Sequence, residues 1–362
     1  MFKPTLPGAL GTAAVLALST GVAQAQHLTI STGLPEHHIW TSAHMEYFAD
    51  QVEEQTDITF TRYYGGELVD IGGERDALDG HVIDVAAPLL APYHEGQFPL
   101  TDVTQLPVYE TNAVMVTAAF QELMESDREL VDGKTFYDYE LGDKDLRGWG
   151  LGTTAVYAIS TDGEELREPG DFDGMPMRAG AALHTVVLEE LGSTPVTIPA
   201  AEAYEAMSRG TIDGIILSVG DWVSYSMEEL LEYTITDVGI GHWQSYLSMT
   251  EEQWDSLSEE QQDTIDAIAL DAAERTAQAF DDQDDEVTET ASADGAEFVP
   301  VTDLSQEMQE HIAEAARATW VTWIEDLEDD GHPARETARL WAELIQEHGG
   351  ELPDGVAEEL EL

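Results

Sequence analysis

The chain has 362 residues, enough for two ordinary domains, and its 43% hydrophobic and 24% charged residues are typical of a globular rather than a disordered protein. With 14 Lys and Arg against 74 Asp and Glu, the formal net charge is -60, which argues against nucleic acid or an anionic membrane surface as a partner because both would be repelled. The chain has no cysteine, which excludes disulfides, thiolate metal sites and cysteine nucleophiles.

The excess of carboxylates predicts a protein that works in high salt. At about 1 M salt the Debye length falls to roughly 3 Å, so the repulsion between surface carboxylates largely disappears. Short, strongly hydrated carboxylates then keep the surface wet. We infer a halophilic or halotolerant source.

The first 25 residues have the order of a secretory signal peptide. Lys3 supplies the positive charge, the run 9–22 is small and apolar, and Ala23-Gln24-Ala25 is a small-x-small cleavage site before Gln26. A membrane anchor is the alternative, but the apolar run is shorter than the roughly 20 residues that a span needs. We therefore predict a signal peptide over 1–25 and a soluble mature protein outside the cytoplasmic membrane.

Residues 26–148 alternate β and α signals and predict a first lobe. Strands are expected over 27–32, 58–64 and 82–88, and a helix over 39–55 carries apolar residues at helical spacing. A shorter helix ends at Gly80. The order βαβαβ predicts a mainly parallel sheet.

The pattern restarts near residue 149, where we expect a hinge, and predicts a second α/β lobe over 149–240. An extended stretch covers 148–161 and is followed by a turn-rich segment. Three strands are predicted, over 175–180, 194–198 and 212–218, and they are separated by helices over 181–191 and 200–209.

The rest of the chain is predicted as a return strand and long helices that span both lobes, over 241–348. Helical spacing of apolar residues covers 251–283, 305–327 and 334–348. The acidic run 281–289 lacks the glycine that an EF-hand loop needs, so we interpret it as a solvated helix face. The tail 349–362 is predicted to be loose.

Motifs of known enzymes are incomplete in this chain, which contains neither GxSxG nor HExxH. The stretch 133–135 resembles the end of a phosphate-binding loop, but Arg128 stands where its first glycine is needed. His37 and His38 could sketch a metal site, although adjacent side chains point in different directions. We therefore expect no cofactor, no metal and no catalysis.

Arg178 is predicted to lie at the carboxyl end of the strand over 175–180. In open α/β sheets ligands bind at the carboxyl ends of strands, and a guanidinium there can hold a carboxylate with two parallel hydrogen bonds. The alternative is an ion pair between Arg178 and one of the 74 acidic side chains. The residues alone leave both interpretations open.

The segment 171–214 resembles the signature of substrate-binding proteins of tripartite ATP-independent periplasmic (TRAP) transporters. That signature has three parts: D-L-x-G-x-K-x-R, then L-G-A-x-P-V-x-x-P, then E-x-Y-x-A-L-x-x-G-x-V-D-G. The matching residues are Asp171, Phe172, Gly174, Met177 and Arg178; Leu191, Gly192, Pro195, Val196 and Pro199; and Glu202, Tyr204, Ala206, Met207, Gly210, Ile212, Asp213 and Gly214. The spacing agrees throughout, and weaker similarity covers nearly the whole mature chain.

The resemblance implies an α/β fold of the two-lobed periplasmic binding protein kind, with crossing strands and long C-terminal helices, that closes on a ligand. It implies that Arg178 clamps a carboxylate. It also implies that the protein is periplasmic, captures a small organic acid and delivers it to TRAP membrane subunits. We expect a monomer.

Two departures from the family pattern define the other candidates in the second lobe. Many members have a second arginine near 150–160, where this chain matches a branch with T-T-x-x-Y; Thr153, Thr154 and Tyr157 are therefore pocket candidates. Some relatives have aromatic and acidic residues directly after the D-G strand. Here Ser218 stands in that region, with Asp221 a little later.

Aromatic residues supply the remaining candidates. Trp222 and Tyr225 follow the apolar strand and could stack on the body of a ligand, or belong to the core. His38 follows the first strand at the equivalent end of the first lobe. Asp221 could receive an ammonium or hydroxyl group, so the ligand could be zwitterionic or amine-bearing.

Two other functions stay open at this point. One is a hydrolase-like enzyme in the cleft, because fold does not fix function. The other is a stand-alone sensor module with the same fold. A binding protein needs only a clamp and a closing hinge, and the missing nucleophile–base pair favours that interpretation.

Overall fold

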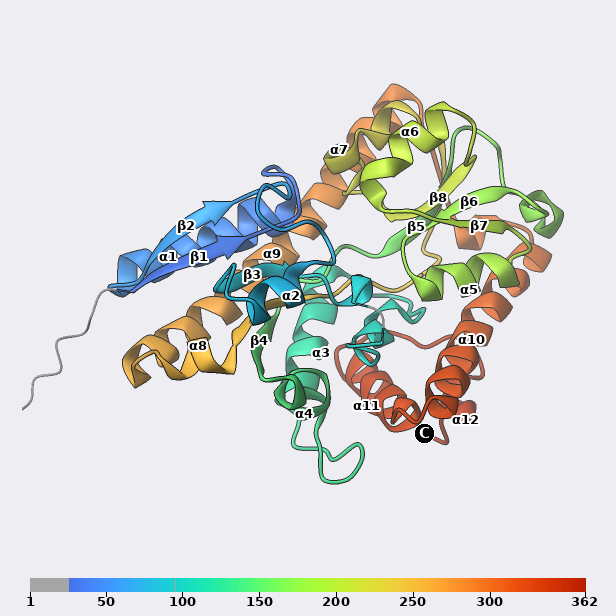
Figure 1. The fold of residues 1–362 in the computed structure, drawn as a ribbon. Helices are drawn as coiled ribbons and strands as arrows, with labels where there is room; N and C mark the ends of the chain where they lie inside the picture. Colours follow the sequence, from blue (N-terminus) through green and yellow to red (C-terminus); the bar gives the residue numbers. More distant parts are fainter. Residues whose placement is uncertain (1–25, 95) are drawn as a thin grey trace, which may run out of the picture.

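The computed structural model of the protein describes residues 26–94 and 96–362, so the predicted signal peptide lies outside the described residues. Two separate sheets, each flanked by helices, form two lobes (Figure 1). The predicted two-lobed α/β fold with long C-terminal helices is confirmed. In the part of the chain that is described, no helix combines the length and the apolar character needed to cross a membrane.

The first sheet has the strand order β2-β1-β3-β10-β4. Its strands are β1 (His27–Ser31), β2 (Thr59–Tyr63), β3 (Val85–Leu89), β4 (Leu146–Gly150) and β10 (Tyr246–Thr250). β1 pairs in parallel with β2 and β3, as predicted, but β10 lies antiparallel between β3 and β4. The prediction of a mainly parallel sheet is corrected at β10, because this strand returns from the second lobe.

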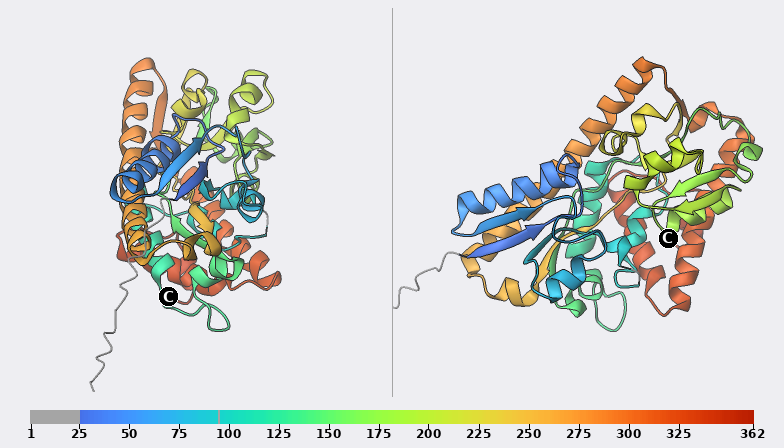
Figure 2. Two further views of the ribbon diagram at one scale, coloured as in Figure 1. Left: turned by 60° about the vertical axis from the view of Figure 1, so that its left-hand side comes forward. Right: turned by 45° about the horizontal axis from the view of Figure 1, so that its top comes forward.

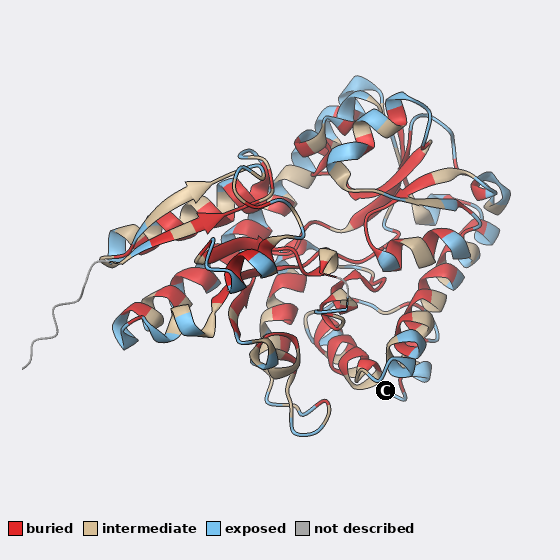
Figure 3. Cartoon of the chain, viewed as in Figure 1, coloured by how far each residue is buried: buried red, intermediate tan, exposed pale blue. Residues whose placement is uncertain are grey.

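The second sheet has the order β11-β9-β5-β8-β6-β7. Its strands are β5 (Tyr157–Thr161), β6 (Pro176–Ala179), β7 (Thr194–Thr197), β8 (Gly214–Ser218), β9 (Tyr233–Thr236) and β11 (Glu297–Pro300). β6 is parallel to both β7 and β8, whereas β5 is antiparallel to β8. β8 is buried at every position (Figure 3), which explains why its sequence is a continuous apolar run rather than an alternating one.

Helices cover the sheets and form most of the C-terminal third. In the first lobe they are a π-helix (η1, Trp40–Met45) that continues as α1 (Glu46–Gln55), then α2 (Glu74–Asp79), α3 (Ala113–Glu125) and α4 (Phe136–Glu140). In the second lobe they are α5 (Ala182–Glu190), α6 (Ala203–Ser208) and α7 (Trp222–Tyr225). The C-terminal helices are α8 (Glu251–Asp255), α9 (Glu259–Asp294), α10 (Gln306–Asp329), α11 (Ala334–Glu347) and α12 (Val356–Glu359).

The helix predicted over 251–283 is two helices. The first, α8, ends at Asp255. Beyond it the Ser258 side chain accepts from the backbone N–H of Gln261, while the Gln261 side chain accepts from the Ser258 N–H. This capping box starts a new helix, α9, which runs on to a glycine C-cap at Gly295.

The helix α9 links the two lobes. It packs against α1 and α3 in the first lobe and against β11 in the second, and Figure 2 shows it running along both. The stretches 151–156 and 237–245 also cross between the sheets, because each joins a strand of one sheet to a strand of the other. Each of these three segments therefore connects the lobes.

The acidic run 281–289 is only partly the solvated face that we predicted. Asp282 and Asp285 are exposed, but Asp281 accepts hydrogen bonds of 2.8 and 3.2 Å from the first two N–H groups of α3. Asp284 accepts one of 2.7 Å from the N–H of Gly220 in the second lobe. Carboxylates are favourable beside backbone N–H groups that have no other partner. Through Asp281 and Asp284 this face of α9 is therefore hydrogen-bonded to both lobes.

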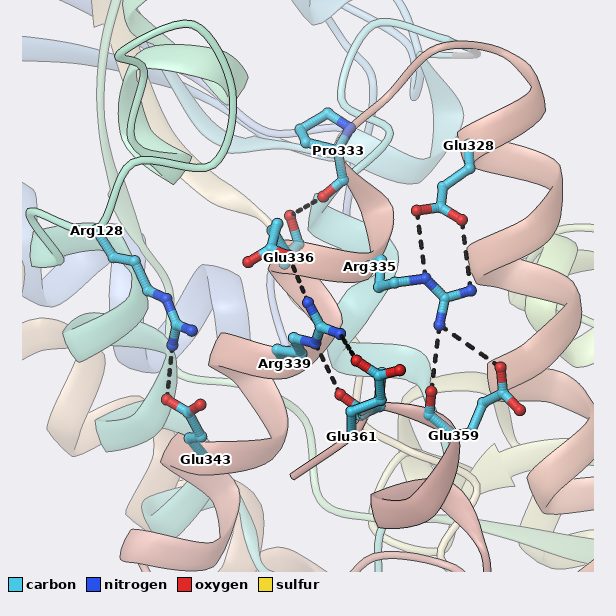
Figure 4. A network of polar contacts seen from close by, with 11 residues as sticks. Arg128, Glu328, Pro333, Arg335, Glu336, Arg339, Glu343, Glu359 and Glu361 are labelled. Atoms are coloured by element: carbon cyan, nitrogen blue, oxygen red, sulfur yellow. Dashed lines mark hydrogen bonds and ion pairs between the residues drawn. The ribbon is translucent and has the colours of Figure 1, made fainter.

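The prediction of a loose tail after Gly349 is wrong. Glu351 forms an isolated bridge with Tyr109, and the α12 region buries Val356 and Leu360 in the core. Arg339 on α11 donates to the carbonyl of Leu360 at 2.7 Å, within a network of arginines and glutamates (Figure 4). The tail packs because its apolar side chains have a core to enter and its carboxylates meet cations.

Candidate ligand-binding site

A cavity of about 270 Å³ lies between the lobes, where the carboxyl ends of strands from both sheets converge. Pro35 follows β1 and Tyr93 follows β3 in the first lobe. Arg178 lies in β6, and Asp221 follows β8 in the second. Both lobes therefore contribute side chains to one cavity.

Other hollows are larger but offer no unpaired cationic side chain among the described residues that line them. Hollows of about 330, 720 and 750 Å³ lie elsewhere on the molecule. The first contains Arg147, but this guanidinium is already paired with Asp266. The other two are lined by several acidic side chains without an arginine or lysine. The interlobe cavity is the better candidate because it contains a buried cation.

Arg178 is the buried cation of the cavity, and only 2% of it is exposed. Its Nε donates to the carbonyl of Ile198 and its Nη1 to the carbonyl of Ile216, both at 3.0 Å. These carbonyls hold the guanidinium plane but do not neutralise its charge. Among the described residues no carboxylate forms an ion pair with Arg178, so the alternative of a structural ion pair is not what the structure shows. A buried cation without a counter-ion is costly unless an anion binds there.

Asp221 is the second charged group at the cavity and is likewise 2% exposed. Its Oδ2 accepts a hydrogen bond of 2.9 Å from the hydroxyl of Ser218. Its Oδ1 has no hydrogen-bond partner in the described part of the chain. Burial raises the pKa of Asp221 to about 6, and the Ser218 bond and the charge of Arg178 oppose that rise.

His38 faces Asp221 from the first lobe. Its Nδ1 accepts the backbone N–H of Trp40 at 3.1 Å, which places the proton of the neutral ring on Nε2. Burial lowers the pKa of His38 to about 3, and the neighbouring His37 adds to the effect. The His38 Nε2 and the Asp221 Oδ1 are 3.8 Å apart. That distance is too long for a hydrogen bond and the imidazole is neutral, so the two residues are not an ion pair.

Aromatic side chains form the walls. Tyr93 and Trp243 have ring centroids 5.7 Å apart, and Tyr157 packs on His184 at 5.0 Å. Burial raises the pKa of Tyr157 and of Tyr225, so both phenols keep their protons. The cavity therefore offers apolar ring faces together with hydroxyl donors.

Six of the predicted site residues line this cavity: His38, Thr154, Tyr157, Arg178, Asp221 and Tyr225. The structure corrects the expected positions of the other three. Thr153 does not line the cavity, and its hydroxyl donates to the carbonyl of Ala113 at 3.0 Å. Ser218 does not line it either, and its hydroxyl donates to Asp221. Trp222 is fully buried and stacks on Phe298 at 5.7 Å, which is the core-packing alternative.

Tyr93 and Trp243 are two of the cavity residues that were missed from the sequence. Tyr93 follows β3, so the rule that ligands bind at strand ends could have found it. Trp243 lies in the crossing stretch 237–245, where no strand end or motif marks it. His37, which precedes His38 in the chain, lies with its Nε2 3.2 Å from the carbonyl oxygen of Ser224. Within residues 26–94 and 96–362 no three potential metal-binding side chains come together.

Comparison with known proteins gives a family and two partial relatives. Residues 30–326 match the family described as bacterial extracellular solute-binding protein, family 7. A solute-binding protein of Albidiferax ferrireducens is 25% identical over 147 residues, which are 40% of this chain and 44% of that protein. One of Roseobacter denitrificans is 29% identical over 115 residues, 32% of this chain and 35% of the relative. The chain thus aligns with less than half the length of either.

Solved structures share the whole architecture. A TRAP solute-binding protein from a marine metagenome, described as specific for aromatic acid ligands and bound to metahydroxyphenylacetate, superposes with a TM-score of 0.77 at 22% identity, over 90% of this chain and 99% of its own. A TRAP solute-binding protein of Rhodoferax ferrireducens with benzoate gives 0.75 at 22% identity, over 89% and 98%. Likeness at this level of identity shows a common fold.

Proposed function

Because this chain belongs to the bacterial extracellular solute-binding proteins of family 7, as the TRAP signature in its sequence predicted, we propose that it captures a small carboxylate between its two lobes. The observation that carries this proposal is the guanidinium of Arg178, which is buried, held in place by two carbonyls and unpaired with any described carboxylate. A ligand carboxylate would supply the missing anion through charge-assisted hydrogen bonds.

The cavity supports an acid with a ring or another compact apolar body. Its volume of about 270 Å³ is near the lower end for small-molecule pockets. Aromatic faces of Trp40, Tyr93, Tyr225 and Trp243 border it. Related proteins of the same fold hold benzoate and metahydroxyphenylacetate, and we extend that ligand class to this chain as part of the proposal.

We place this activity in a TRAP transport system. In this proposal the mature protein, starting near Gln26, works as a monomer in the periplasm of a salt-loving bacterium and delivers its ligand to TRAP membrane subunits. Residues 26–148 form most of the first lobe and residues 149–240 most of the second, and the segments that cross between them include the hinge. The family description as extracellular solute-binding supports the location.

The arrangement of side chains favours binding over hydrolysis. Ser218, Asp221 and His38 lie near one another, as in a catalytic triad. The Ser218 hydroxyl donates to Asp221, however, at 2.9 Å, and not to His38. In a catalytic triad the serine hydroxyl donates to the histidine, which acts as its base. Here the hydroxyl of Ser218 is bound to Asp221 instead, so His38 is not placed to act as that base.

A thermal-shift screen of small carboxylates in molar salt tests the proposal. A ligand at 100 times its dissociation constant should add about 2.7 kcal/mol to the free energy of unfolding. Arg178→Lys keeps the charge but loses the planar fork, so it should bind the same ligand about tenfold or more weakly. Arg275→Lys, an exposed arginine paired with Asp271, is the matched control. The proposal fails if no acid stabilises the protein or if Arg178→Lys binds within about twofold of wild type.

A further inference from the structure

The cavity contains a second polar element besides Arg178, made of one side chain from each lobe. The Oδ1 of Asp221 is a buried acceptor without a hydrogen-bond partner in the described residues. The Nε2 of His38 lies 3.8 Å from it, and both residues line the cavity. Neither atom satisfies the other, because the gap exceeds hydrogen-bonding distance.

The hydrogen-bonding character of each atom follows from its contacts on the far side. The backbone N–H of Trp40 donates to the Nδ1 of His38 at 3.1 Å, so in the neutral ring the Nε2 must carry the hydrogen. The hydroxyl of Ser218 donates to the Oδ2 of Asp221 at 2.9 Å, which orients the carboxylate and leaves Oδ1 as an acceptor. The cavity therefore presents one donor and one acceptor side by side.

A hydroxyl group is the simplest ligand group that can hydrogen-bond to both the donor of His38 and the acceptor of Asp221. Its oxygen accepts from the Nε2–H of His38, while its hydrogen is donated to the Oδ1 of Asp221. An ammonium has donors only, and the nitrogen of an arylamine is a poor acceptor because its lone pair is delocalised into the ring, so either group leaves the Nε2–H unmet. A second carboxylate has acceptors only and would face Asp221 with a like charge.

We propose that His38 and Asp221 form a hydroxyl-recognition pair and that the ligand is a hydroxy acid, with its carboxylate on Arg178 and its hydroxyl on this pair. The inference rests on the proposed function and narrows its ligand class. It assigns to His38, Asp221 and the supporting Ser218 the role of specificity determinants.

Packing around the pair makes it rigid. The ring of His38 contacts Tyr225 and Phe280, with ring centroids at 6.1 and 6.3 Å. Asp221 follows the fully buried strand β8. A ligand without the hydroxyl would leave a buried acceptor and a buried donor unpaired, and sites built in this way reject such analogues strongly.

Calorimetry in molar salt with matched acids tests the pair. The probes are benzoate with its three monohydroxy and three monoamino derivatives, and phenylacetate with its ring-hydroxylated derivatives and mandelate. We expect at least one hydroxy acid to bind about tenfold or more tightly than its parent acid. The amino derivative with the same substitution position should show no comparable gain.

Variants connect the gain to the two residues. Asp221→Ala and His38→Phe should each reduce the gain from the hydroxyl to about twofold or less while the parent acid still binds. Asp255→Ala, an exposed aspartate in α8, is the matched control and should keep the full gain. Continued binding of the parent acid shows that the variants fold.

Failure of the inference and failure of the proposed function give different results. If parent acids bind in an Arg178-dependent way but no hydroxyl adds affinity, the pair has no role in recognition. The same holds if Asp221→Ala keeps the gain. If no acid of the panel binds, or if Arg178→Lys leaves binding intact, the carboxylate site itself is wrong and the inference is overturned with it.

Discussion

The guanidinium of Arg178 lies directly against the backbone of Gly180. A Cβ on residue 180 would stand 2.7 Å from the Nη2 of Arg178 and 2.9 Å from its Cζ and Nη1. Real Cβ atoms do not approach other atoms so closely. The absence of a side chain at this position is therefore a condition for the observed place of the arginine, which two carbonyls also hold.

Gly180→Ala should weaken carboxylate binding without unfolding the protein. The new methyl group must push the guanidinium out of its plane, so we expect the affinity for a carboxylate found in the screen to fall by about tenfold or more, a change of about 1.4 kcal/mol. Calorimetry measures the change. Gly170→Ala is the control, because no heavy atom lies within 4 Å of its added Cβ. Equal affinities for the two variants would show that the arginine adapts freely.

Asp221 should make stability depend on pH in the ligand-free protein. Its pKa is about 6 in the folded state against 3.8 ordinarily, so the folded state binds the proton more tightly. The resulting stabilisation is complete below pH 3.8 and is lost as the pH rises through 6. Asp221→Asn removes it. Urea unfolding should therefore show that the free energy of unfolding of the wild type, relative to that of the variant, increases by up to about 3 kcal/mol when the pH falls from 7 to 4.

Comparing the wild type with Asp221→Asn isolates the contribution of Asp221 to the pH dependence of stability. Buried histidines such as His44, whose pKa is lowered to about 3, destabilise the folded state in acid, but they are present in both proteins and cancel. Parallel curves of unfolding free energy against pH for wild type and variant would contradict the prediction.

The C-terminal tail should contribute to stability. Leu360 is fully buried, whereas Leu362 is 47% exposed. We expect Leu360→Ala to lower the free energy of unfolding by about 2–5 kcal/mol, because it removes buried methyl groups and leaves a cavity. Leu362→Ala should change it by less than about 0.5 kcal/mol. Denaturant unfolding of both proteins in molar salt gives the two values, and a small loss for Leu360→Ala would mean that the tail does not stabilise the core.

Stability should also rise steeply with salt. With a formal charge of -60, repulsion between carboxylates opposes the compact state when screening is weak. The melting temperature should climb from dilute buffer to molar sodium chloride, and potassium chloride should have the same effect if screening is the cause. A flat dependence would show that the carboxylates are compensated locally, and the inference of a halophilic source would then fail.

Regular elements were predictable where the signal is local. The alternation of apolar runs and turn residues located β1, β2, β6, β7 and β8 within a few residues. The entry of β10 between β3 and β4 was not predictable, because strand order depends on where the chain returns from the other lobe. The tail was misjudged because its few apolar residues are stabilised only by contact with distant helices.

By itself, the sequence determined the family, the two-lobed α/β fold and the position of Arg178 at a strand end, because a contiguous motif and local periodicity encode all three. Only the tertiary structure decided that Arg178 has no counter-ion, that Tyr225 faces the cavity while Trp222 enters the core, and that His38 meets Asp221 across the lobes. These facts depend on contacts between residues far apart in the chain. Such contacts exist only after the lobes have folded and come together, so no local pattern records them.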